Sequence, residues 1–202
     1  MQPSIFPCAF LPSISYVQIW MSASEPIIDL GEPYIRQTFR NRAHILGSQG
    51  VTKLIIPVKK GPSNQPMHEV MIDYHHAWPR KYWHAITSAY QNAPYFEHYA
   101  VELQDIWLSQ PDSLARFSLD LFRWIMQQIQ PETKIKANNL SNIGTVDDYR
   151  KMDFLDIGNN DYLPYKQVFS YKFPFYQNIS VLDLLFNRGP ETVYIISKKK
   201  CF

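Results

Sequence analysis

The sequence predicts a single α/β or α+β domain over residues 1–202, with a mixed sheet from the N- and C-terminal segments covered by central helices. Strand-like segments lie near both ends of the chain, whereas apolar residues at helical spacing dominate its middle. The 202 residues are 46% hydrophobic and 15% aromatic, which suits one compact core rather than a disordered chain.

The first third of the chain supplies most of the predicted strands. A short helix is predicted over 14–21, and extended segments are predicted over 5–10, 26–30, 51–59 and 68–73. The segment VTKLIIPVK (51–59) is the clearest strand, because β-branched residues alternate along it after a glycine. Its Pro57 marks a sheet edge or a strand end, and 68–73 is its expected partner.

Three helices are predicted in the middle of the chain. They cover 79–92, a segment that begins near Pro94, and a segment that follows Pro111, each with apolar residues three and four positions apart. Residues 131–164 are polar and rich in Asn and Gly, so we expect loops and short helices there. A strand over 165–173 and a helix over 180–187, with Ser180 as its N-cap and Gly189 just past its end, complete the prediction.

Composition and motifs exclude several classes of protein. The net charge of +2 is too small for a dedicated nucleic-acid binder, and no run of 18 apolar residues predicts a transmembrane helix. The first twenty residues lack a positive start and contain three prolines, so we read no signal peptide and expect a cytoplasmic protein. Dinucleotide-binding, P-loop and nucleophile-elbow motifs are absent, and Cys8 and Cys201 have no metal-ligand spacing.

The stretch PYIRQTFRNRAHI (33–45) concentrates three arginines in thirteen residues. If 34–45 is extended, Arg36, Arg40 and Arg42 project to one face together with His44. Three guanidinium groups on one face repel one another unless an anion or carboxylates lie among them. Three interpretations stay open: a phosphate or nucleotide-sugar site, an internal salt-bridge network with Glu32 and Glu69, or an exposed basic strand.

Several motifs resemble those of the WbqC-like family of bacterial proteins, which often occur among surface-polysaccharide (O-antigen) biosynthesis genes. The resemblance rests on AFLPSISY, on RQTFRNRAHI…GVTKLIIPVKK, on HAITSAYQNAPYFEHY and on NISVLDLLFNRGPE, in this order. The chain departs from the family pattern at Pro7–Cys8, where relatives have Gln-Pro, and at Ser15, where they have glycine.

The resemblance implies a transferase-like protein that binds an anionic small molecule, such as a nucleotide sugar. Gln37 and Asn41 would orient the ligand that the arginines hold, and Glu32 or His44 would be the acid or base. The aromatic element contributes Tyr90 and Tyr95 as candidate ligand contacts. Asp183 is either a partner for an arginine such as Arg42 or a base. The alternative is a non-enzymatic module that binds an anionic glycan precursor or a partner enzyme; no metal site and no particular cofactor are predicted.

Overall fold

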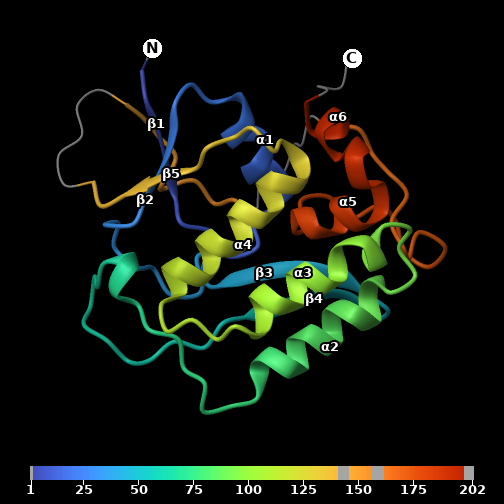
Figure 1. The fold of residues 1–202 in the computed structure, drawn as a ribbon, viewed down its shortest axis with the longest axis horizontal. Coiled ribbons are helices and arrows are strands. Elements are labelled where there is room, and N and C mark those ends of the chain that lie inside the picture. The colour runs from blue at the N-terminus through green and yellow to red at the C-terminus, as the bar shows by residue number, and fades with distance from the viewer. Residues whose placement is uncertain (1, 141–145, 156–161, 198–202) are drawn as a thin grey trace.

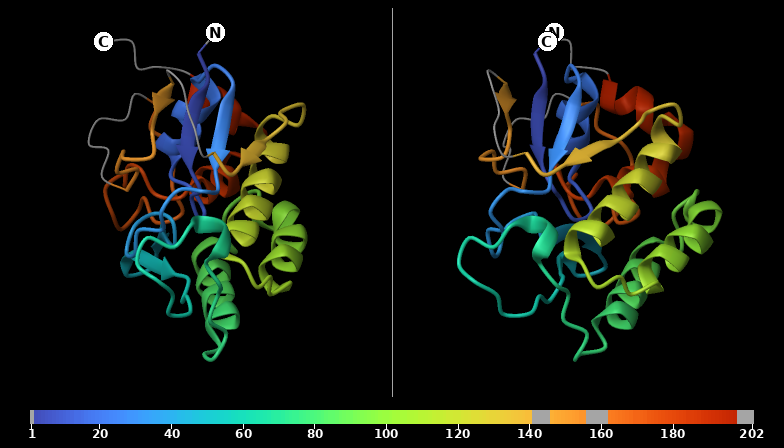
Figure 2. Two further views of the ribbon diagram at one scale, coloured as in Figure 1. Left: turned by 90° about the vertical axis from the view of Figure 1, so that its left-hand side faces the viewer. Right: turned by 60° about the vertical axis from the view of Figure 1, so that its left-hand side comes forward.

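The computed structural model describes residues 2–140, 146–155 and 162–197 (Figure 1). A main core cluster unites buried side chains from Phe6 near the N-terminus to Ile196 near the C-terminus. Figure 2 shows a parallel sheet in one half of the molecule and a β-hairpin in the other, with the central helices along one side.

The larger sheet is entirely parallel within the described residues. Its strand order is β5-β2-β1-β6, with β1 (Ser4–Pro7), β2 (Pro26–Asp29), β5 (Lys136–Asn138) and β6 (Asp147–Asp148). Helix α1 (Ile14–Ser22) connects β1 to β2, as a parallel pair requires. All four residues of the central strand β1 are buried, which is typical of a parallel strand covered on both faces.

The second sheet is an antiparallel hairpin of β3 (Arg42–Gly47) and β4 (Gly50–Ile55). The register runs from Arg42 opposite Ile55 to Gly47 opposite Gly50, so two residues form the connection. Gly50 adopts a φ of +102°, a backbone conformation that favours glycine.

Helices fill the rest of the fold. They are α2 (Trp78–Tyr90), α3 (Phe96–Leu108), α4 (Leu114–Ile129), α5 (Val181–Arg188) and α6 (Thr192–Ser197), with short 3₁₀ turns at Met67–Glu69 and Gly189–Glu191. Helix α2 packs on β3, and α3 packs on both α2 and α4. The indole of Trp107 on α3 donates to the carbonyl of Pro79 on α2 at 2.8 Å, which fixes the two helices together.

The α/β class and the helices are confirmed, including the Ser180 cap, whose hydroxyl accepts from the Leu182 amide. Two strand predictions are wrong, because 165–173 contains turns and 68–73 contains the end of a 3₁₀ turn and isolated bridges. The predicted pairing of 51–59 with 68–73 is right only past the end of β4, where Val58 and Ile72 form an antiparallel bridge, whereas β4 itself pairs with β3. Strands β5 and β6 instead come from the polar segment predicted as loop, because two or three residues are too few to show a hydrophobic period.

Candidate functional site

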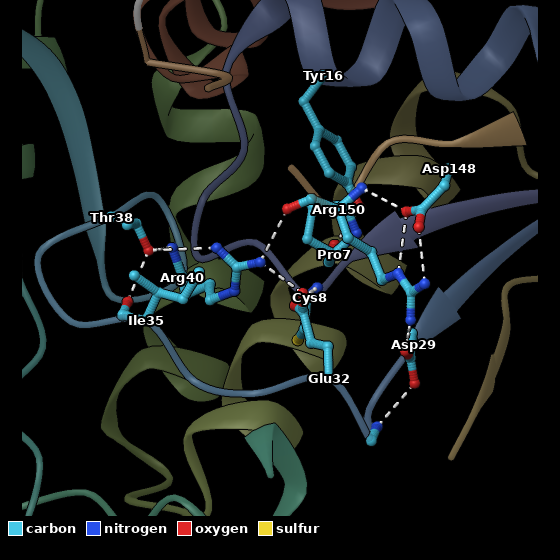
Figure 3. Close-up of polar contacts among 11 residues, drawn as sticks. Pro7, Cys8, Tyr16, Asp29, Glu32, Ile35, Thr38, Arg40, Asp148 and Arg150 are labelled. Carbon is cyan, nitrogen blue, oxygen red and sulfur yellow. Dashed lines mark hydrogen bonds and ion pairs between the residues drawn. The ribbon is translucent and has the colours of Figure 1, made fainter. Parts of the chain in front are cut away.

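A network of ion pairs lies where the parallel strands end (Figure 3). The carboxylate of Glu32 faces the guanidinium of Arg40, with 2.5 Å between Oε2 and Nη2. Each residue is 2% exposed, and the second oxygen of Glu32 accepts from the Cys8 amide at 3.0 Å. Burial raises the pKa of Glu32, while the hydrogen bond and charge of Arg40 act in the opposite direction. This pair therefore matches the salt-bridge interpretation of the motif.

A second arginine extends the network across the sheet. Arg150 lies just past β6 and donates to Asp148 at the end of β6 and to Asp29 at the end of β2, at 2.7 Å from each carboxylate (Figure 3). Its backbone carbonyl accepts from Nη2 of Arg40 at 3.0 Å. Asp29 also accepts from the backbone amides of Gly31 and Leu140. In open α/β sheets this edge commonly forms the ligand crevice, but here charged side chains that bond to one another fill it.

The arginine-rich stretch is not extended before Arg42, and the predicted single face is wrong. The chain turns between 36 and 41, where Gln37 has a φ of +65°. The Thr38 hydroxyl donates to the carbonyl of Ile35 at 2.8 Å and accepts from the Arg40 amide, which holds the turn. The turn points Arg40 into the protein and leaves Arg36 and Gln37 exposed.

Arg36 lies at a cleft of about 360 Å³, which is within the range of small-molecule sites. Its walls are held together by bonds from the Tyr34 amide to the Gln65 carbonyl and from the Met67 amide to the Glu32 carbonyl, at 2.8 and 2.9 Å. The lining residues are Tyr34, Arg36, Lys59, Gly61, Pro62, Ser63, Asn64, Gln65 and Val70. Two cations and no carboxylate therefore line this cleft in the described part of the chain.

The cations of the cleft have no acidic partner among the residues that the structure describes. Among the described residues, neither Arg36 nor Lys59 forms an ion pair. The hydroxyl of Tyr34 is buried and has no hydrogen-bond partner there. Burial raises the pKa of Tyr34 to about 12, although the charges of Arg36, Arg42 and Arg40 lower it. Tyr34 therefore lines the cleft, and its buried hydroxyl has no partner in the described part of the chain.

Arg42 and His44 lie on β3 with their side chains half-buried. Both line a small cavity of about 10 Å³, together with Asn178 and Ser180, which is room for about one water molecule. Nε of Arg42 is buried without a partner in the described part of the chain. Burial, and then the charges of Lys53 and Arg42, lower the pKa of His44, which favours its neutral form at pH 7.

The remaining predicted residues have structural contacts away from the cleft. The Asn41 side chain donates to the Ile56 carbonyl at 3.0 Å. Tyr90 is buried and accepts from the Leu46 amide, and its ring lies 5.1 Å from that of Phe186. Tyr95 donates its backbone amide to the carbonyl of Phe186. Tyr90 and Tyr95 therefore pack against β3 and α5, and neither of them lines the cleft.

Asp183 pairs with no arginine in the described part of the chain, so its expected pairing with Arg42 is wrong. Its carboxylate is fully buried and accepts from the Tyr165 hydroxyl at 2.6 Å and from the Gln167 amide at 3.0 Å. Burial raises its pKa to about 6, against the lowering effect of these hydrogen bonds. Glu69, the other expected partner, forms no ion pair with an arginine in the described part of the chain, and its carboxylate lies 3.9 Å from the imidazole of His68.

The sequence analysis did not name Lys59, Tyr34 or the loop after Lys59 as candidate site residues. One sequence signal points to them. Residues 33–68 contain none of the 18 Asp and Glu residues of the chain, although they contain six of the 20 Lys and Arg residues. In such a segment most cations lack a local partner, and Lys59 is one of them.

The described residues contain neither a membrane-spanning helix nor a cluster of metal ligands. No helix there has the length and apolar character needed to cross a membrane. In the same residues, no three His, Cys, Asp or Glu side chains are grouped so that they could hold a metal ion.

Comparison with known proteins agrees with the motif resemblance. The chain is similar to the uncharacterized protein Rv1507c of Mycobacterium tuberculosis, with 27% identity over 215 aligned positions that cover 90% of this chain and 91% of the relative. No solved structure matches the chain. The model of the WbqC-like protein family matches residues 7–160, well over half of the sequence. The chain therefore belongs to the WbqC-like protein family.

Proposed function

We propose that the protein binds an anionic small molecule, carrying a phosphate or a carboxylate, in the cleft between Tyr34–Arg36 and the loop after Lys59. In this proposal it is a transferase-like protein of bacterial surface-polysaccharide biosynthesis, and a nucleotide sugar is the ligand class to test first. The observation that carries the binding proposal is the lining of the cleft, which has Arg36 and Lys59 and, within the described ranges, no carboxylate.

The chemistry of the lining supports an anion over a neutral ligand. A guanidinium group offers paired donors to phosphate or carboxylate, and a lysine adds a compact positive charge. The side chains of Ser63, Asn64 and Gln65 add hydrogen-bonding groups at the same cleft. Two unpaired cations near each other also repel, and a bound anion relieves that repulsion.

Of the two candidate acid or base residues, His44 is better suited to proton transfer. Glu32 is buried against Arg40 and already accepts from the Cys8 amide, so both of its oxygens are occupied. The lowered pKa of His44 favours a neutral imidazole, which accepts a proton at pH 7. His44 lines the small cavity beside β3 and not the cleft, so in the transferase proposal it takes the proton of an acceptor group that reaches that cavity.

Thermal melting with a panel of anions tests binding at the cleft. The panel contains nucleotide sugars, nucleotides, inorganic phosphate and simple carboxylates. A ligand at one hundred times its dissociation constant adds about 2.7 kcal/mol of stability, which for a chain of this size raises Tm by roughly 5–10 °C. We expect Arg36→Ala and Lys59→Ala to abolish the shift, whereas the exposed Arg80→Ala on α2 keeps it. An unchanged shift in both cleft variants would rule out this cleft.

One observation favours the alternative, a binding module without catalysis. Within the described residues, the lining of the cleft contains neither a carboxylate nor an imidazole that could act as acid or base on a bound ligand. Incubation with a nucleotide sugar and ³¹P NMR distinguishes the two functions. Release of the nucleotide by the wild type, slowed in His44→Ala, supports a transferase. Saturable binding with no release supports a binding module.

A further inference from the structure

The outer edge of β4 has backbone groups that no other strand of the described structure uses. In an antiparallel pair, residues alternate between those that bond across the pair and those whose N–H and C=O groups point outward. The two-residue connection makes Gly47 and Gly50 the first bonded pair. Counting from that pair, Val51, Lys53 and Ile55 on β4 direct their backbone groups away from β3.

The same rule accounts for the bonds of β3, which supports this assignment. The outward residues of β3 are then His44 and Leu46, opposite Lys53 and Val51. The carbonyl of His44 accepts from the Ser180 amide at 2.7 Å, and the Leu46 amide donates to the Tyr90 hydroxyl at 3.3 Å. The outer edge of β3 is therefore covered, whereas no such bond occurs to the outer edge of β4 in the described part of the chain.

The side chains along this edge combine charge with apolar surface. Val51 is 39% exposed, Lys53 is exposed and Ile55 is half-buried. All three lie on one face of the hairpin, because they alternate along the strand. They belong to the segment 33–68, which holds six Lys and Arg residues and no Asp or Glu. The strand edge thus belongs to a segment of the chain whose charged side chains are all positive.

We propose that the outer edge of β4 docks an extended acidic segment of a partner protein, which adds to the hairpin as a third strand. Backbone hydrogen bonds to Val51, Lys53 and Ile55 would give affinity, and alternate side chains would give specificity. A carboxylate beside Lys53 and apolar residues two positions away on each side, beside Val51 and Ile55, are the pattern that fits this edge.

A second copy of this chain fits the edge poorly. Two β4 strands that pair antiparallel around their middle bring Lys53 beside its own equivalent, and like charges in neighbouring strands are destabilising. Arg42 on β3 adds a second positive charge to the hairpin. The docking surface uses residues other than those lining the cleft, so the proposal stands independently of the proposed function.

Binding of short peptides tests this proposal. The probe is a labelled heptapeptide, TITETVT, whose alternate residues present one carboxylate between two apolar side chains. One matched probe replaces its glutamate with lysine. Another carries methyl groups on the backbone nitrogens that would face β4. Fluorescence anisotropy measures affinity, and amide hydrogen exchange followed by NMR reports on Val51, Lys53 and Ile55.

We expect the acidic peptide to bind and to slow the exchange of these three amides, and both matched probes to bind more weakly. Lys53→Glu should weaken binding of the acidic peptide about fivefold, whereas Lys81→Glu, the same charge change on α2, should leave it unchanged. Melting curves of both variants check that they fold. The proposal is overturned if the three amides exchange equally fast with millimolar peptide, if the sign of the peptide charge makes no difference, or if the protein dimerises through this edge.

Discussion

Arg40 and Arg36 belong to one short motif, but their environments are opposite. Arg40 is 2% exposed and bonded to a buried carboxylate, whereas Arg36 is exposed at a cleft without an acidic residue. The turn held by Thr38 separates them and leaves Arg40 buried and Arg36 exposed. The comparison teaches that residue type alone does not assign an arginine to a ligand: the neighbouring carboxylate decides.

The largest expected loss of stability follows from replacing the paired arginine, Arg40. Arg40→Met leaves the carboxylate of Glu32 buried without its cation, which costs about 3–5 kcal/mol. For a chain of this size the loss lowers Tm by roughly 6–20 °C, as calorimetry or circular dichroism measures.

The double variant Arg40→Met/Glu32→Gln is the matched control. It removes both charges but retains an oxygen that accepts from the Cys8 amide, so most of the lost stability should return. If Arg40→Met melts like the wild type, the buried ion pair contributes nothing to the fold and the comparison fails.

A smaller loss of stability is expected when Arg150, the second paired arginine, is replaced. Arg150→Ala removes a 2.7 Å bond to Asp29, but that carboxylate keeps two backbone donors. We expect a loss of about 2 kcal/mol in the free energy of unfolding, measured with urea. Arg150 also lowers the pKa of Asp148 below 3.8, so its contribution is present above that pH and is lost as the pH falls further. A gap between the two proteins that is unchanged at low pH would contradict this role.

Asp183 provides a contrast to Glu32, because it is a buried carboxylate with no arginine partner in the described part of the chain. Its pKa is raised from 3.8 to about 6 in the folded protein, chiefly by burial. The folded state therefore binds this proton more tightly than the unfolded state, and the contribution of Asp183 to stability decreases as the pH rises from about 4 to 6. Asp183→Asn should lack this decrease in urea unfolding. If the free energies of unfolding of the two proteins change with pH in the same way, the pKa of Asp183 is not raised in the folded protein.

The smallest effect on stability is expected for the unpaired arginine. Arg36→Ala removes an exposed side chain with no ion pair in the described part of the chain, so the free energy of unfolding should change by less than about 0.5 kcal/mol. Chemical denaturation beside Arg80→Ala provides the comparison. A loss as large as that of Arg40→Met would mean that Arg36 also holds the fold.

The helices and the motif could be predicted from the sequence because their signals are local. Apolar residues three and four apart, prolines at helix starts and the Ser180 cap depend on neighbours in the chain. Strands β5 and β6 could not be predicted, since each has only two or three residues and is defined by its partner strand. The wrong strand over 165–173 shows the converse, because aromatic and β-branched residues there pack as turns over β3.

The candidate site was harder to predict than the fold. The sequence placed Glu32 among the possible partners of the arginines, and this partner was right. It could not show that a turn at Gln37 breaks the alternation, because a positive φ at a glutamine has no clear sequence signal. Lys59 reaches the same cleft as Arg36 from 23 positions further along the chain, a contact that only the folded chain defines.

The most direct test of the central claim is an NMR titration of the arginine Nε–H signals with UDP-glucose and, separately, with inorganic phosphate. The different roles of Arg36 and Arg40 predict that the Arg36 signal shifts and saturates with at least one of these anions, while the Arg40 signal stays in place. Movement of the Arg40 signal with no change at Arg36 would contradict the claim, because the buried ion pair would then be the binding site. No change in either signal would contradict the anion-binding function itself.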